Sequence, residues 1–195
     1  PFEDESEKSA ELLFALGQLK VAQASVAFHV EMDPERGIGL VRQSEDYFRE
    51  YIAVAPEDAA KGTFQLLSSR AEEAMIRFRM GDNDAAIALA REVTGEFEAA
   101  LEAYPDDIDL LYGLARAERT LSEILVNSEQ GEEAVAAAAD SLAALDRIRS
   151  LIPAETLSWW RAEQFSHWRR AYALYLTGHA AEAVEDYYEA RRYAN

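Results

Sequence analysis

A chain of 195 residues is long for a minimal domain and short for two, so its length favours one unit with a substantial core. Hydrophobic residues make up 49% and charged residues 29%, which excludes a disordered tail, while 9 Gly and 5 Pro are too few for a turn-rich all-β domain. The 36 alanines favour helices, because alanine loses no side-chain entropy on ordering. A net charge of −18 repels phosphate backbones and anionic membrane surfaces, so nucleic acid is not an expected partner.

The negative charge is unevenly distributed along the chain. From Ala154 onward, five basic and six acidic residues leave −1, so residues 1–153 carry −17. The absence of cysteine excludes disulfides, thiol nucleophiles and Cys-ligated zinc, but it does not identify the compartment, and the cytoplasm is only slightly favoured over the periplasm. The longest apolar run, Ala134 to Ala139, has six residues, so we expect no membrane insertion.

Helix-breaking residues recur along the chain with a period of about 48 residues. They are, in order, Pro56, Gly81, Pro105, Gly131, Pro153 and Gly178. The two proline intervals are 49 and 48 residues, and the two glycine intervals are 50 and 47. Two breakers in phase predict a structural repeat, and the helical spacing of the apolar residues between them predicts that each repeat is a hairpin of two helices.

The period predicts four antiparallel hairpins and eight helices in a single domain, over residues 5–55, 56–104, 105–152 and 153–195. In the first hairpin we expect helices from about Ser6 to Val30 and from about Ile38 to Val54, joined by the loop Asp33 to Gly37. Each proline suits a helix start, and each glycine suits the left-handed residue that ends a helix. Asp106 and Asp107 are expected to cap the helix that follows them.

The last hairpin resembles the tetratricopeptide repeat (TPR). The residues that carry the resemblance are Ala171, Leu174, Gly178, Ala183, Tyr187 and Ala190. The period departs from the family's, which is about 34 residues, so the chain is similar to a long-period variant of the kind appended to bacterial signalling proteins. The resemblance implies an all-α superhelix whose concave face is lined by the first helix of each hairpin and binds a partner segment.

No arrangement of residues predicts catalysis, a metal or a cofactor, so we do not expect an enzyme. Asp82-Asn83-Asp84 lacks the offsets of a calcium loop and is interpreted as a hairpin turn. Gly37-Ile38-Gly39 lacks the third glycine of a dinucleotide turn and is interpreted as a loop. His29, His167 and His179 are far apart in sequence and are interpreted as core or surface imidazoles.

The seventh expected helix is unusually aromatic, since all three tryptophans lie within residues 159–168. Steps of 4, 3, 4 and 3 place five side chains on one stripe of this helix: Arg161, Phe165, Trp168, Tyr172 and Tyr175. The neighbouring stripe contains Trp160, His167, Ala171 and Leu174. One interpretation is that both stripes are buried in the core, as in a helix packed between other helices. The alternative is that the first stripe lines the concave face.

In that alternative, the aromatic rings offer apolar contact, while Arg161 and Arg169 bind a carboxylate or an acidic peptide through bidentate hydrogen bonds. Met75 and Phe78 would line the corresponding stripe of the second hairpin, and Leu121 with Leu125 that of the third. The groove would be apolar in the middle and cationic toward the C-terminal end.

Trp159 is predicted to lie on a polar stripe of the seventh helix, together with Glu163, Ser166 and Arg170. A large aromatic side chain in such a place indicates an interface or a contact at the helix end.

These observations favour a non-catalytic scaffold that holds a protein or peptide segment. The alternative is a ligand-sensing module of a larger bacterial signalling protein, motivated by the aromatic and arginine cluster and by the absence of an initiator Met. The end of the last hairpin, which runs Tyr187-Tyr188-Glu189-Ala190-Arg191-Arg192-Tyr193, leaves two further possibilities. Either these tyrosines are buried inward, or the chain forms a homodimer through its C-terminal hairpin.

Overall fold

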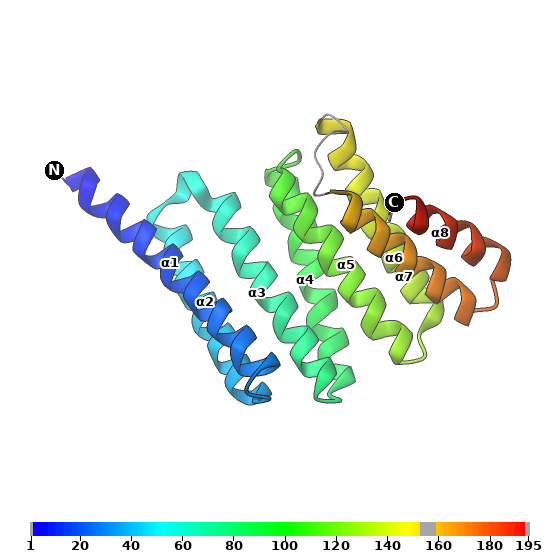
Figure 1. Cartoon of the computed structure of the whole chain (residues 1–195). Helices are drawn as coiled ribbons and strands as arrows, with labels where there is room; N and C mark the ends of the chain where they lie inside the picture. The colour runs from blue at the N-terminus through cyan, green and yellow to red at the C-terminus, as the bar shows by residue number, and fades with distance from the viewer. Residues whose placement is uncertain (1, 153–158, 194–195) are drawn as a thin grey trace. The chain divides into compact units, whose positions relative to one another are not determined.

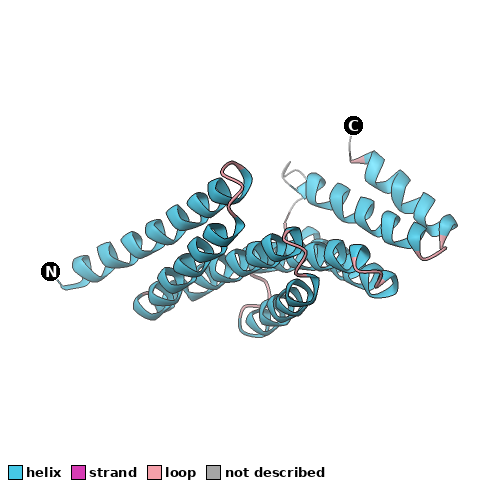
Figure 2. Cartoon of the chain, turned by 90° about the horizontal axis from the view of Figure 1, so that it is seen from below, coloured by secondary structure: helices cyan, strands magenta, loops and turns pink. Residues whose placement is uncertain are grey.

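The computed structural model describes residues 2–152 and 159–193, with side chains from residue 9 to 152 and from residue 161 to 193. The described residues form eight α-helices and one short 3-10 helix, with no β-strand (Figures 1 and 2). The α-helices are α1 Phe2–His29, α2 Pro34–Val54, α3 Ala59–Arg79, α4 Asn83–Ala103, α5 Ile108–Asn127, α6 Gly131–Leu151, α7 Trp159–Leu176 and α8 Ala180–Arg192. The predicted all-α class and the helix number are confirmed.

The chain forms two compact units, Pro1–Tyr104 and Pro105–Asn195, which are described separately. In the first unit α1 packs on α2, α2 on α3 and α3 on α4, and α1 also contacts α3. In the second unit α5 to α8 pack in the same sequential manner, and α5 also contacts α7. The boundary between the units coincides with the predicted boundary between the second and third hairpins. The prediction of a single domain stays a prediction.

Several helix ends follow the predicted chemistry. Gly81 and Gly178 follow the ends of α3 and α7 with φ of 85° and 87°. This left-handed conformation is unfavourable for residues that have a Cβ. The Asp107 carboxylate accepts a hydrogen bond from the Leu110 amide at 2.9 Å and caps α5, as predicted. The Asp33 carboxylate caps α2 in the same way, at 3.0 Å from the Arg36 amide.

Other boundaries were predicted wrongly. Gly131 does not end α5 but begins α6, and Glu129 takes the left-handed conformation with φ of 61°. The α6 start instead comes so close to the end of α7 that a Cβ on Gly131 would lie 2.5 Å from Thr177 Cγ2. The second helix begins at Pro34 rather than near Ile38, because Pro34 can occupy the first turn once Asp33 caps it. The segment Gly37-Ile38-Gly39 is therefore helical and not a loop.

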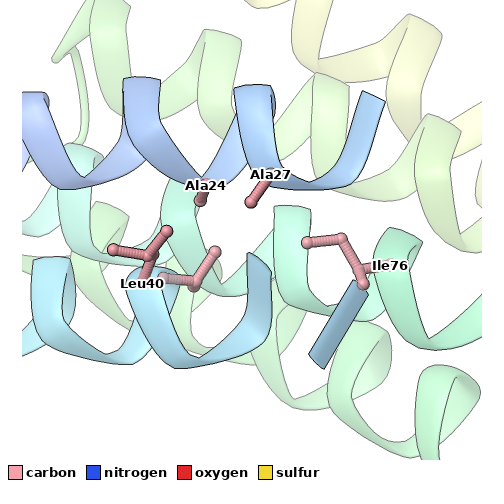
Figure 3. Close-up of a cluster of buried hydrophobic side chains, with 5 residues drawn as sticks. Ala24, Ala27, Leu40 and Ile76 are labelled. Atoms are coloured by element: carbon pink, nitrogen blue, oxygen red, sulfur yellow. The ribbon is translucent and has the colours of Figure 1, made fainter. Parts of the chain in front are cut away.

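The core of the first unit depends on small residues of α1. Ala24 and Ala27 are almost fully buried and face Leu40 of α2, with Ile76 of α3 beside them (Figure 3). Their small side chains allow α1 to approach α2 closely, and larger neighbours fill the remaining space.

Gly17 of α1 provides a test of this close approach. A Cβ at Gly17 would lie 2.6 Å from Cε1 of the fully buried Phe48, whereas a Cβ at Gly95 of α4 meets nothing within 4 Å. We therefore expect Gly17→Ala to lower the free energy of unfolding by about 1–2 kcal/mol through overpacking. The matched change Gly95→Ala should raise it by about 0.5–1 kcal/mol through helix propensity. Urea unfolding of both variants measures these values, and equal effects of the two would contradict the packing.

Candidate functional site

Polar contacts with α6 and α8 fix the orientation of α7 within the second unit. The Ser166 hydroxyl lies 2.9 Å from the Ser141 hydroxyl of α6, and the buried Glu163 carboxylate pairs with Arg149 of the same helix. On the side of α7 that faces α8, Arg170 donates hydrogen bonds to the Asp186 carboxylate. The polar stripe predicted from the sequence, Glu163, Ser166 and Arg170, therefore faces neighbouring helices. The side chain of Trp159 lies outside the described residues.

Toward α8, the polar network continues through His167. Its Nδ1 lies 2.8 Å from the Asp186 carboxylate, whereas the Arg170 guanidinium makes bonds of 2.5 and 2.7 Å to the same group. Burial alone would raise the pKa of Asp186, but the hydrogen bonds from His167 and Arg170 outweigh it and hold the pKa below its ordinary value. The predicted neighbouring stripe is buried here too, at Ala171 and Leu174.

These contacts leave the predicted aromatic stripe facing solvent. Phe165, Trp168, Tyr172 and Tyr175 are 53%, 45%, 41% and 67% exposed. Arg161 is exposed on the same helix. The indole of Trp168 stacks on the Tyr172 ring, with centroids 6.2 Å apart and planes inclined by 7°. Core packing therefore does not explain this stripe, which is a large exposed apolar surface.

An apolar groove of about 360 Å³ runs between α7 and α8. Its lining consists of Trp168, Ala171, Tyr172, Tyr175, Ala180, Ala183, Val184 and Tyr187. Ala171 and Ala183 are buried between the two helices, where small side chains allow close approach.

Two tyrosines of α8 remain at the surface, because Tyr187 and Tyr188 are 53% and 59% exposed. The alternative of inward burial is therefore wrong for these two tyrosines, whereas the half-buried Tyr193 stacks on the His167 ring. A homodimer through this hairpin stays a prediction.

Arginines of α5 and α7 border the aromatic stripe. The Arg119 guanidinium lies 5.7 Å from the Phe165 ring centroid, and that of Arg169 lies 5.0 Å from the Trp168 centroid. Arg169 pairs with Glu123 of α5 at 2.8 Å. Burial, together with the neighbouring cations of Arg116 and Arg169, lowers the pKa of Arg119. Positive charge is thus concentrated on this face of a strongly acidic chain.

Arg116 and Arg119 differ from the other arginines of the site in their ion pairing. Among the described side chains, no carboxylate lies within 4.0 Å of either guanidinium. Arg116 instead lies 6.0 Å from the Tyr112 ring centroid. The sequence analysis missed both residues, although Tyr112, Arg116 and Arg119 repeat the 4, 3 spacing of α7. The residues chosen for this helix, Leu121 and Leu125, are buried in the core.

Two predicted site residues lie in the other unit. Met75 and Phe78 are half-buried on α3, where the Arg79 guanidinium lies 5.7 Å from the Phe78 ring centroid. Both residues belong to the first unit, whereas Trp168 and its neighbours belong to the second.

The first unit contains a cleft of about 640 Å³ that the sequence analysis did not identify. Its lining combines arginines of α2 and α3 with carboxylates. The buried Glu73 accepts hydrogen bonds from Arg42 at 3.0 Å and from Arg77 at 2.7 Å. Arg49 pairs with Glu45 at 2.6 Å, and Arg70 pairs with Glu92 at 2.9 Å. The Arg42–Glu73 and Arg70–Glu92 pairs join neighbouring helices, whereas the other two pairs lie within one helix. Each of these cations has a carboxylate partner, so little charge is left for a ligand.

Other chemistry is sparse in the described part of the chain. It contains no group of three or more His, Asp or Glu side chains suited to a metal ion. Asp82 lies at the turn between α3 and α4, 3.3 Å from Arg77, in agreement with the hairpin-turn interpretation. His29 and His179 are exposed. No described helix carries an apolar segment long enough to cross a bilayer.

Comparison with known proteins does not place the chain in a family. No protein-family model and no curated protein matches it. A solved structure described as the crystal structure of BtubC (BKLC) from P. vanneervenii shares 16% sequence identity over 94% of this chain and 87% of that chain, with a TM-score of 0.35. A TM-score this low carries no argument, so the candidate site depends on its own geometry.

Proposed function

We propose that this protein is a non-catalytic interaction module that binds an acidic, apolar segment of a partner protein across α5, α7 and α8. The observation that carries the proposal is the exposed row of four aromatic rings on α7, with the Arg119 guanidinium of α5 lying 5.7 Å from the Phe165 ring centroid. Aromatic and arginine side chains dominate the binding energy of many protein interfaces. Rings supply apolar contact, and guanidinium groups favour carboxylates.

The same proposal includes a TPR-like architecture. The first helices of the third and fourth hairpins, α5 and α7, contact each other and carry the aromatic and cationic side chains. In a TPR-like superhelix such first helices line the concave face, which is where we place the partner segment. The TPR-like alanines at the α7/α8 crossing, Ala171 and Ala183, support this architecture.

Selection from a phage-displayed library of random peptides tests the function without a known partner. We expect the full chain to enrich peptides that combine Asp or Glu with aromatic or aliphatic residues. Replacement Arg119→Glu should weaken their binding at least tenfold by reversing the charge beside Phe165. The control Arg147→Glu changes the net charge equally but lies on α6, and should change affinity less than about twofold.

The salt dependence provides a further readout of the same complex. Raising NaCl from about 50 to about 500 mM should weaken binding, since salt screens exposed charges. A library that yields no binder would contradict the proposed function. Selected peptides that bind the Arg119→Glu variant as tightly as the unchanged protein would contradict the site.

A small anionic ligand is the second candidate occupant, as expected for a sensing module. The groove between α7 and α8, at about 360 Å³, falls in the size range of small-molecule sites. A ligand that binds only the folded state raises the melting temperature by mass action. A thermal-shift screen with carboxylate and phosphate metabolites therefore supports this candidate if a compound stabilises the protein but not a Tyr175→Ala variant.

A further inference from the structure

A second apolar surface lies on α1, in the first unit. Leu12, Leu19 and Val26 are 59%, 50% and 48% exposed, although they are large aliphatic side chains. The smaller Ala15 and Ala22 are exposed between them. Together these five residues form the α1 stripe, with steps of 3, 4, 3 and 4, the repeat that forms the seam of a coiled coil.

The α1 stripe is distinct from the face that packs within the unit. Ala10, Ala24 and Ala27 are buried, and Gly17 lies against Phe48 of α2. The helix therefore has apolar residues on two faces, and the described part of the first unit covers only one of them. A helix that is apolar on both faces is typical of one with packing partners on both sides.

The charge distribution indicates which partner fits the α1 stripe. Residues 9–28 contain two charged side chains, Glu11 and Lys20, in a chain whose net charge is −18. The exposed residues beside the stripe include Gln18, Gln23 and Ser25. Two copies of so acidic a chain repel each other over most surfaces, but residues 9–28 carry one carboxylate and one cation and can meet their own copy with little repulsion.

The order of large and small side chains along the α1 stripe is also suited to pairing with a second copy of the stripe. Leu19 lies at the centre, with Ala15 and Ala22 on either side and Leu12 and Val26 each seven residues away. An antiparallel copy related by a two-fold axis near Leu19 therefore presents large and small side chains in the same order. In an isologous interface the same patch of both subunits makes the contact, so the patch must be complementary to itself. Such an interface gives a dimer and no larger assembly.

We infer that two copies of this chain associate through antiparallel pairing of their α1 helices about Leu19. The inference is independent of the proposed partner site in the second unit, and it places self-association away from the C-terminal hairpin. The exposed Tyr187 and Tyr188 of α8 are less suited to a self-contact, because they lie beside Glu185 and Glu189 in the sequence, whereas residues 9–28 of α1 contain one carboxylate.

The dimer is expected to be weak. The 20 residues from 9 to 28 offer a seam of roughly 30 Å at about 1.5 Å per residue. Such a seam buries less than the roughly 800 Å² per partner of a standard interface. Association should therefore occur at micromolar concentrations or above. Added salt should strengthen it, because salt screens the repulsion between two chains of net charge −18. Partner binding in the second unit should respond to salt in the opposite direction.

Sedimentation velocity of the full chain at about 1 to 500 micromolar tests the inference. We expect a monomer–dimer equilibrium that Leu19→Glu and Ala22→Glu each weaken at least tenfold. Both positions are solvent-exposed, and circular dichroism should show unchanged helicity. The control Met80→Glu places the same charge at another exposed apolar residue of this unit and should leave the equilibrium unchanged.

Single cysteines provide an independent readout, because the natural chain has none. Oxidation should link two copies of Leu19→Cys across the two-fold axis, whereas Val54→Cys should remain largely monomeric. A monomer at every concentration would overturn the inference. It would equally be overturned by a dimer that persists in Leu19→Glu but is lost in Tyr188→Glu, or by an assembly that grows beyond two copies.

Discussion

Replacement of Trp168 by alanine is expected to weaken binding of the selected acidic peptides by about 30-fold or more, equivalent to the 2 kcal/mol typical of a hot spot. The Trp168 ring stacks on Tyr172, lies 5.0 Å from the Arg169 guanidinium and lines the groove between α7 and α8. Its truncation removes apolar contact area from the centre of the surface. Fluorescence anisotropy with a labelled peptide measures the change.

The matched control for this prediction is Tyr104→Ala. Tyr104 is 40% exposed, comparable to Trp168 at 45%, but it ends the first unit and belongs to no part of the proposed surface. Its replacement should change affinity less than about twofold. Because Trp168 is already half exposed, the Trp168→Ala variant should keep its helicity and most of its stability. Unchanged affinity in a folded Trp168→Ala variant would exclude α7 as the binding surface.

The largest expected effect on stability comes from Asp186. Its carboxylate is 2% exposed and accepts hydrogen bonds from His167 and Arg170, so it joins α7 to α8. Replacement by alanine leaves a partly buried guanidinium unpaired, and loss of one member of a buried ion pair costs about 3–5 kcal/mol. We expect Asp186→Ala to lower the free energy of unfolding by about 3 kcal/mol in urea.

The controls for Asp186 separate charge from shape. Asp186→Asn keeps the side-chain shape and one hydrogen-bond acceptor, so its loss should be smaller than that of the alanine variant. Asp140→Ala removes an exposed carboxylate from α6 and should change stability by less than about 0.5 kcal/mol. Equal stability of all three variants would contradict the polar network between α7 and α8.

The pH dependence of stability follows from the same network. The pKa of Asp186 is lowered from its ordinary value of 3.8 on folding, because the hydrogen bonds from His167 and Arg170 outweigh the effect of burial. Its contribution is therefore fully present above that value and is lost as the pH falls through the lower folded pKa. The unchanged protein should lose this part of its stability in acid, whereas Asp186→Asn should lack that part of the pH dependence.

The helix pattern could largely be predicted from the sequence, because breakers and helical periodicity act locally. Gly81 and Gly178 end helices, and Asp107 caps one, through interactions within a few residues. Gly131 could not be assigned in this way, since its role is close approach to Thr177, 46 residues away. The repeat period shows where a glycine or proline recurs. It does not show whether that residue is needed for a turn or for close contact with a neighbouring helix.

The candidate site could be predicted only in part, for a related reason. Spacing identified two apolar stripes on α7, but which stripe is buried depends on where α6 and α8 lie. The partners of Glu163, Ser166 and Arg170 could not be predicted, because they come from other helices. Arg116 and Arg119 were missed since their importance arises from the aromatic and cationic side chains around them.

The exposed aromatic row of α7 is best tested by hydroxyl-radical footprinting with mass spectrometry, on the free protein and on its complex with a selected acidic peptide. The account predicts that the peptide protects Phe165, Trp168, Tyr172 and Tyr175 from oxidation and leaves Tyr104 and Met80 of the first unit unchanged. Protection of the first unit alone, or no protection along α7 in a saturated complex, would contradict it.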